Sequence, residues 1–375
     1  MNQQQERLIS LDMFRGFTIA LMILVNNPGD WSHVYAPLLH AKWHGWTPTD
    51  LVFPFFLFIV GVAMSYSFSR RIMLGDTKLQ LWVKIITRTI IIFAIGLLLS
   101  LFPFFHFSEM RIPGVLQRIA VCYFFASLLL IYWSKKFQCG WTVFLLLIYW
   151  ILIKTIPVPG YGAGMIDQPQ GNLCWYLDSQ LLAGHTWKNA PAPGFDPEGI
   201  FSTIPAIATV MLGIFAGDWL RSRQKQNQKV IGLLVAGIVG LVLGSIMNIW
   251  LPINKNLWTS SYAVFMSGLA AIFLAVCYWF IDVKGFKTWT KPFVVFGSNA
   301  ITVFALSGIV AKLTIYIKWK QADGSLISLR TFLYDNFFHS WASDYFASLL
   351  YPIFWNLIFL GLMWILYRRR IFIKV

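Results

Sequence analysis

The chain has 375 residues, of which 58% are hydrophobic and only 12% carry a charge. A soluble domain of this size needs far more charge to cover its surface, so these values exclude an ordinary globular protein. The formal net charge of +15 does not indicate nucleic-acid binding, because no basic stripe alternates with aromatic stacking positions. The long apolar runs instead predict helices that cross a lipid bilayer.

Apolar runs bounded by charges or by Pro and Gly predict a single all-α transmembrane domain over residues 1–375. A helix needs about 20 apolar residues to cross the hydrocarbon core, and about ten such runs are present. We expect spans near residues 11–27, 50–68, 84–104, 115–133, 141–157, 200–220, 230–250, 260–281, 292–312 and 347–367. Two longer connections, which we expect at the outer face, remain near residues 158–199 and 313–346.

The distribution of Lys and Arg predicts how the bundle is oriented. Alternate connections and the C-terminal tail are rich in positive charge, whereas the opposite connections are longer and poorer in it. The charged set is Arg70, Arg71, Lys78, Lys84 and Arg88; Lys135 and Lys136; Arg221, Arg223, Lys225 and Lys229; Lys284, Lys287 and Lys291; and Arg368, Arg369, Arg370 and Lys374. The positive-inside rule therefore predicts cytoplasmic termini, in agreement with an even number of spans. We expect no cleavable signal peptide, because Asp12 and Arg15 interrupt the first apolar run.

Polar residues concentrate in four connections on the predicted outer side. These are residues 26–50, residues 111–118, residues 195–200 and residues 252–258. If the orientation is right, the four segments lie at the same end of the bundle. We therefore expect them to converge on one cavity between the helices.

Several of these polar residues also have a purely structural interpretation. Thr47-Pro48-Thr49-Asp50 has the pattern of a capping box, so Asp50 is either a helix cap or a functional acid. Asp196 and Glu198 also precede a helix, but two acids exceed what capping needs, which makes Glu198 the better functional candidate. Arg118 lies at the start of the fourth span, where a cation needs a partner or an anionic ligand.

The histidines of the first outer connection do not predict a metal site. His40 and His44 are four residues apart, which suits a metal only on a helix, whereas Gly45 and the neighbouring aromatic residues favour a loop. A single histidine beside a cavity can instead act as a general base, because its unperturbed pKa is about 6.5. The residue pattern alone does not select His40 over His44.

Taken together, the motifs resemble the heparan-α-glucosaminide N-acetyltransferase family. The resemblance is carried by Leu11-Asp12-Met13-Phe14-Arg15-Gly16, His40-Ala41-Lys42-Trp43, Asp50-Leu51-Val52-Phe53-Pro54, Arg111-Ile112-Pro113-Gly114-Val115-Leu116-Gln117-Arg118, Asp196-Pro197-Glu198-Gly199 and Asn254-Lys255-Asn256-Leu257-Trp258. It runs in order from residue 8 to about residue 310.

This resemblance implies an activity and two site residues. The animal enzymes acetylate the terminal glucosamine amine of heparan sulfate inside lysosomes, with acetyl-CoA from the cytosol. Their essential histidine lies in a His-Ala-x-Trp segment, here His40, and an Asn at the end of the first span, here Asn26, belongs to the same site. The chain resembles the short bacterial members, so we expect a bacterial inner-membrane protein whose site opens to the periplasm.

The residues and the resemblance predict transfer of an acetyl group across the membrane. His40 either takes a proton from the acceptor amine or is itself acetylated. Asn26 or Asn256 suits the developing oxyanion, and Asp50 or Glu198 holds the ammonium or orients the imidazole. The predicted catalytic set is His40, Asn26 and Asp50; the acceptor set is Glu198, Asp196, Trp43, Asn254 and Asn256; the set binding acetyl-CoA is Arg118, Lys255, Arg88, Trp258 and Gln117. No metal is expected.

Two other functions remain open at this stage. The sequence does not separate an amine acceptor from a hydroxyl acceptor, so an O-acyltransferase of envelope glycans is one alternative. A solute transporter is the other, although the polar motifs gather at one face and no pair of broken helices is evident in corresponding halves. The oligomeric state is also open, a homodimer included.

Overall fold

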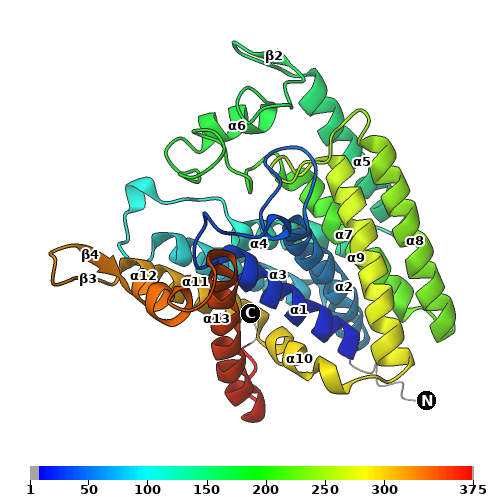
Figure 1. Cartoon of the computed structure of the whole chain (residues 1–375). Helices are drawn as coiled ribbons and strands as arrows, with labels where there is room; N and C mark the ends of the chain where they lie inside the picture. The colour runs from blue at the N-terminus through cyan, green and yellow to red at the C-terminus, as the bar shows by residue number, and fades with distance from the viewer. Residues whose placement is uncertain (1–7, 374–375) are drawn as a thin grey trace.

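The computed structural model describes residues 8–373, and helices make up most of this part of the chain. Within it, nine helices are long and apolar enough to cross a membrane, and a bent helix pair brings the number to ten if it counts as one span. The predicted all-α membrane fold is therefore confirmed. Figure 1 shows the helices gathered into one bundle. Lys374 lies outside the described residues.

The spans follow the predicted order. They are α1 (Ile9–Asn26), α2 (Val52–Met73), α3 (Lys78–Leu101), α4 (Val115–Tyr132), α5 (Lys135–Thr155), α7 (Thr203–Arg221), α8 (Gln226–Met247), α9 (Ser260–Tyr278) and α13 (Asp344–Arg368). The helices α3 and α5 begin at Lys78 and Lys135, earlier than the predicted residues 84 and 141. Their first turns carry lysines, whose long stems let the charge stay in water while the helix continues into the apolar layer.

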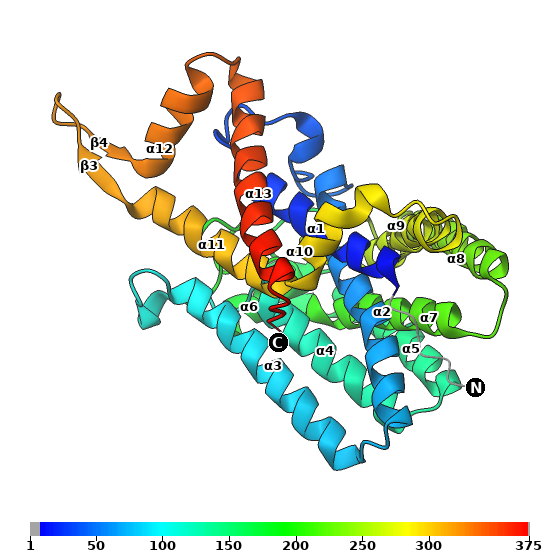
Figure 2. The same cartoon turned by 90° about the horizontal axis from the view of Figure 1, so that it is seen from below.

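The predicted span over residues 292–312 is not one straight helix. It consists of α10 (Lys291–Ser298) and α11 (Ala300–Tyr316), which meet at an angle of 73°. Asn299 lies at the break with a non-helical backbone, φ −130° and ψ 41°. Its side chain donates to the carbonyl of Ile371 at 3.2 Å and accepts from the N–H of Ile373 at 2.8 Å. Figure 2 shows the C-terminal end beside this junction, so the tail satisfies polar groups at the break.

The helices α2 and α7 form the centre of the bundle, and two glycines let them touch. A Cβ atom on Gly61 would lie 2.0 Å from the carbonyl oxygen of Val210, and one on Gly213 would lie 2.1 Å from that of Phe58. Only small residues permit such a close approach of two membrane helices. By contrast, α3 and α8 bury just 17% and 22% of their most apolar windows, so these helices face lipid.

The two long connections lie outside the helical core. The first contains a hairpin of β1 (Pro157–Val158) and β2 (Gly162–Ala163), followed by α6 (Leu173–Leu181). The second contains a hairpin of β3 (Lys318–Lys320) and β4 (Leu326–Ser328), followed by α12 (Leu329–Tyr334). In Figure 1, β2 and α6 lie at the upper end of the bundle, and the segment around α6 lies close to the connection between α1 and α2.

Contacts between helix ends show which connections share a side. The side chain of Asp282, just beyond α9, accepts from the N–H groups of Ile9 and Ser10 at 3.3 and 3.2 Å, which caps the start of α1. Arg221 at the end of α7 donates to the carbonyl of Ser65 at 2.9 Å. Lys135 at the start of α5 also pairs with Asp218 near the end of α7. These contacts join the charged connections to their neighbours, and since each long helix starts near the end at which the preceding one finishes, the connections with the polar motifs lie at the opposite end of the bundle.

Candidate active site

The connection between α1 and α2 brings His40 against Asp50. The Nδ1 atom of His40 lies 2.6 Å from Oδ1 of Asp50. The Asp50 side chain is 1% exposed, whereas that of His40 is 46% exposed. When Nδ1 carries the proton and donates it to the carboxylate, Nε2 is left with its lone pair as a base. The pair therefore has the geometry of a general base and the acid that orients it.

Asp50 is both a helix cap and the partner of His40. The sequence had left a structural role and a functional role open for this acid, and its contacts are compatible with both. Its Oδ2 atom accepts from the N–H groups of Thr47 and Ala41, both at 3.0 Å. The predicted capping box at Thr47 is present. The backbone carbonyl of Asp50 also accepts from the hydroxyl of Tyr262 at 2.6 Å. One buried carboxylate thus fixes the loop, the helix start and the imidazole.

Lys255 is the third member of this group. Its Nζ lies 3.0 Å from both Nδ1 and Nε2 of His40, and 3.6 Å from Oδ1 of Asp50. Burial lowers the pKa of the Lys255 ammonium, although the charges of Asp50 and Glu198 oppose this. The structure therefore places a predicted contact of the acetyl-CoA donor directly against the predicted base.

Asn254 builds the turn that carries Lys255. Its Oδ1 accepts from the N–H of Leu257 at 2.9 Å, and its own N–H donates to Oγ1 of Thr259 at 3.1 Å. Asn254 is completely buried, and its amide nitrogen lies 3.3 Å from Nδ1 of His44. Most hydrogen-bonding groups of Asn254 therefore already have partners within the protein. Asn256, which follows Lys255 in the same turn, has a partly exposed side chain.

Trp43 and His44 attach the connection after α5 to the His40 loop. The indole N–H of Trp43 donates to the carbonyl of Ile166 at 2.9 Å, and its ring packs on Phe195 at a centroid distance of 5.9 Å. Nε2 of His44 lies 3.1 Å from a carboxylate oxygen of Asp167. Both residues thus position the first long connection beside His40.

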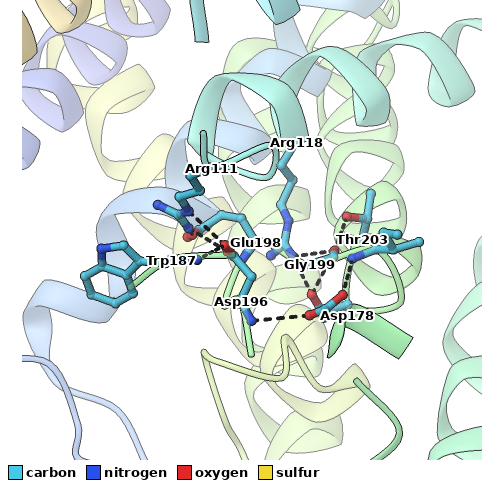
Figure 3. A network of polar contacts seen from close by, with 10 residues as sticks. Arg111, Arg118, Asp178, Trp187, Asp196, Glu198, Gly199 and Thr203 are labelled. Atoms are coloured by element: carbon cyan, nitrogen blue, oxygen red, sulfur yellow. Dashed lines mark hydrogen bonds and ion pairs between the residues drawn. The ribbon is translucent and has the colours of Figure 1, made fainter. Parts of the chain in front are cut away.

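A second polar cluster lies around Arg111, a residue of the Arg111–Arg118 motif that was not among the predicted site residues (Figure 3). Arg111 donates two hydrogen bonds to the carboxylate of Asp196, at 2.8 and 2.6 Å, and a further one to Glu198. Its guanidinium also lies 5.5 Å from the ring centroid of Trp187. Burial alone would raise the pKa of Glu198, but the charges of Arg111, Arg118 and Lys255 together outweigh burial, and the pKa is lowered. The Glu198 carboxylate is therefore favoured in its ionised form.

Asp178 on α6 supports the turn that carries these acids, and no sequence motif had indicated it. Its carboxylate accepts from the N–H groups of Asp196 and Ile200 at 3.3 and 3.0 Å (Figure 3). A Cβ atom on Gly199 would lie 2.0 Å from this carboxylate, so only glycine fits there. Burial, helped by the charge of Asp196, raises the pKa of Asp178 to about 7.

Arg118 lies between the two clusters and keeps unused hydrogen-bond donors. It is 2% exposed, and its Nη2 donates to the carbonyl of Gly199 at 3.1 Å and to Ser202. Its Nε and Nη1 atoms have no hydrogen-bond partner, and the same holds for Nε2 of Gln117. Among the described residues, no ion pair joins Arg118 to Glu198. A buried guanidinium with free donors is suited to an anionic or strongly accepting ligand.

Trp258 closes this region from the side of α9. Its ring centroid lies 5.2 Å from the guanidinium carbon of Arg118, and its indole N–H donates to Thr209 at 3.2 Å. Its φ of +48° is in the left-handed region, which costs a non-glycine residue about 1–3 kcal/mol. Such strain is often found at functional sites, where the surrounding packing holds it in place.

Two predicted site residues lie apart from these clusters. Asn26 is exposed at the end of α1 and lines a cavity of about 190 Å³ together with Lys312 and Tyr351. Arg88 lies on α3 with its guanidinium carbon 4.9 Å from the ring centroid of Tyr123. The described residues show no hydrogen bond or ion pair from either side chain to His40. In residues 8–373, no three His, Cys, Asp or Glu side chains are grouped so as to hold a metal ion.

Comparisons with known proteins and with family models all point to the same family. A family model described as the catalytic part of heparan-alpha-glucosaminide N-acetyltransferase matches residues 7–242. The mouse and human proteins named heparan-alpha-glucosaminide N-acetyltransferase are each 30% identical to this chain, over 84% and 98% of its length. The matches span 55% and 60% of those two proteins.

Proposed function

Since this chain belongs to the heparan-alpha-glucosaminide N-acetyltransferase family, we propose that it transfers an acetyl group from acetyl-CoA to the amine of a glucosamine-type sugar. The observation that carries the proposal is the 2.6 Å contact between His40 and the buried Asp50. A base oriented in this way, on a partly exposed surface, suits an amine that must lose a proton as it attacks a thioester.

The proposed reaction has two versions that use the same residues. In the first, Nε2 of His40 takes a proton from the amine while the amine nitrogen bonds to the acyl carbon and the C–S bond breaks. In the second, Nε2 itself attacks the thioester, and the amine then takes the acetyl group from the histidine. In both versions Asp50 stabilises the charged imidazole, and the leaving thiolate finally receives the proton. We keep Asn256 as a candidate donor to the oxyanion because it neighbours Lys255 in the same turn.

We also propose that the donor and the acceptor approach from opposite sides. The connections rich in Lys and Arg lie at the end opposite His40, and the positive-inside rule assigns them to the cytoplasm. Acetyl-CoA would enter from that side, and its phosphates and carbonyls are suited to the two free donors of Arg118. The acceptor sugar would wait at the outer face, so the acetyl group changes compartment while CoA returns.

The proposal is tested by incubating the purified protein with acetyl-CoA and glucosamine and measuring free thiol and N-acetylglucosamine. His40→Ala should reduce the rate by about 10²–10⁴-fold, the usual contribution of a general base. His44→Ala is the matched control, because the polar contacts of His44 are with Asp167 and Asn254 and not with His40 or Asp50, so this variant should keep substantial activity. Equal losses in both variants would contradict the assignment. Thiol release with a sugar that has hydroxyl groups but no amine would favour the O-acyltransferase alternative.

A further inference from the structure

In the proposed reaction the acceptor amine must lie beside His40, and the amine of Lys255 already lies there. The Nζ atom of Lys255 lies 3.0 Å from each ring nitrogen of His40 and 3.6 Å from Asp50. The acceptor of the proposed reaction is also a primary amine, and it needs the same neighbours: a base for its proton and a carboxylate for its charge. Lys255 therefore satisfies the contacts that the sugar amine would make.

The backbone holds Lys255 in this position. Asn254 fixes the turn through Leu257 and Thr259, and the next residues place the strained Trp258 against Arg118. The Lys255 side chain is 17% exposed, so little water surrounds its amine. Burial lowers its pKa in spite of the two nearby acids, which makes the neutral, nucleophilic amine more accessible than on an ordinary surface lysine.

We propose that Lys255 is an internal acceptor that becomes acetylated when no sugar occupies the site. The inference rests on the proposed function, because it needs a reactive thioester beside His40. The neutral Nζ attacks the acyl carbon of the thioester or of acetylated His40, so a C–N bond forms and the C–S or C–N bond to the donor breaks. The proton leaves Nζ for His40 and passes to the thiolate of CoA. Nζ lies 3.0 Å from Nε2, so an acyl carbon bonded to Nε2 would be within the reach of about 3–3.5 Å that direct attack requires.

Acetylation would switch the site off. The product is a neutral amide that no longer forms an ion pair with Asp50. It also occupies the position next to the His40 ring that the acceptor amine needs. A bound amino sugar would prevent this reaction by displacing the lysine, so the sugar and Lys255 compete for the same acetyl group. The modification should therefore be limited to one acetyl group at one lysine of each chain.

Two other lysines provide matched controls. Lys42 lies two residues from His40 in the sequence and is exposed, and Lys188 is 69% exposed in an ion pair with Glu109. If acetyl-CoA reacted with lysines according to their exposure, it would label these accessible amines better than Lys255. Selective labelling of Lys255 therefore reports on the site, since exposure alone predicts the opposite order.

The test uses the full-length wild-type protein in detergent with acetyl-CoA and no sugar, followed by peptide mass spectrometry. Lys255 should be acetylated well above Lys42 and Lys188, and excess glucosamine or His40→Ala should bring Lys255 down to their level. Incubation with acetyl-CoA alone should then abolish later transfer to glucosamine in the wild type. In Lys255→Arg, whatever activity remains should survive that incubation, because a guanidinium is not acetylated.

The outcomes separate this inference from the function on which it rests. If the protein acetylates glucosamine but Lys255 is labelled no more than Lys42 and Lys188, the inference is wrong and the proposed function stands. Equal labelling of Lys255 in the wild type and in folded His40→Ala would also overturn it. If neither thiol release nor N-acetylglucosamine is detected, the proposed function itself fails.

Discussion

Replacing Asp50 by Asn should remove most of the activity without removing the fold, and the structure indicates why. One carboxylate oxygen faces Nδ1 of His40 at 2.6 Å, and the other accepts from the N–H groups of Ala41 and Thr47 at 3.0 Å. An amide has one accepting oxygen and one donating nitrogen, so it cannot serve both sides.

The cost of unsatisfied hydrogen-bond donors decides which way the side-chain amide of the Asp50→Asn variant would be oriented. If the amide oxygen faced His40, the amide nitrogen would meet two backbone donors, and each buried unsatisfied donor costs about 1–3 kcal/mol. If the oxygen instead faces Ala41 and Thr47, the amide nitrogen donates to Nδ1 of His40. The second arrangement is cheaper, and it moves the imidazole proton to Nε2, where the base is needed. We therefore expect a rate loss of about 10²–10⁴-fold, equivalent to about 3–5 kcal/mol in the activation barrier.

The assay is the rate of thiol release with acetyl-CoA and glucosamine, alongside the melting temperature in detergent. Asp30→Asn is the matched control, because Asp30 also contacts a histidine, His33, at 2.7 Å in the same connection. That carboxylate is 34% exposed, so water can replace it and the rate should stay close to wild type. A folded Asp50→Asn protein with the wild-type rate would refute the proposed role of the pair.

Three further predictions concern the donor, the pH dependence and the orientation. Arg118→Gln should weaken CoA binding more than Arg118→Lys, since Lys keeps the positive charge but lacks the planar guanidinium. Normal CoA affinity in a stable Arg118→Gln protein would show that Arg118 does not bind the donor. The pKa of Asp178 is raised from 3.8 to about 7, so its stabilising effect is complete below about pH 4 and is lost as the pH rises through about 7. Asp178→Asn should therefore show a smaller fall in melting temperature between about pH 5 and about pH 8 than the wild type, and an unchanged fall would contradict the raised pKa. A single cysteine near His40 should react with an impermeant thiol reagent from outside, whereas one near Arg223 should react only after the membrane is broken; the reverse would overturn the orientation.

The order and number of the spans were predictable because each helix must present a long apolar surface to lipid. The break at Asn299 was not, since averaging hydropathy over a whole span hides one polar residue whose partners lie at Ile371 and Ile373. The sequence also predicted that the four polar connections converge. Contacts between His40 and Lys255, between Arg111 and Glu198 and between Arg118 and Trp258 bring them together, whereas the single cavity and its outer position stay predictions.

The arrangement within the site was only partly predictable. The capping pattern singled out Asp50, but nothing in the ten-residue spacing shows that the loop returns His40 to the same carboxylate. Arg111 could have been selected as the counter-charge of two neighbouring acids, since buried carboxylates need a cation. Asp178 could not, because its partners are backbone N–H groups of a turn that forms only in the folded protein. The roles of Asn26 and Arg88 stay predictions from the resemblance and from charge.

The bond between Asn299 and the C-terminal tail has a practical consequence for handling the protein. Residues 371–373 would ordinarily be regarded as a dispensable extension after α13, and therefore as a convenient place to trim the gene or attach a purification tag. Here they supply both partners of an amide that is 2% exposed at the α10–α11 junction. Shortening the protein before Ile371 would leave that amide unsatisfied next to α1, on which α10 packs, so tags belong beyond these residues with a flexible spacer.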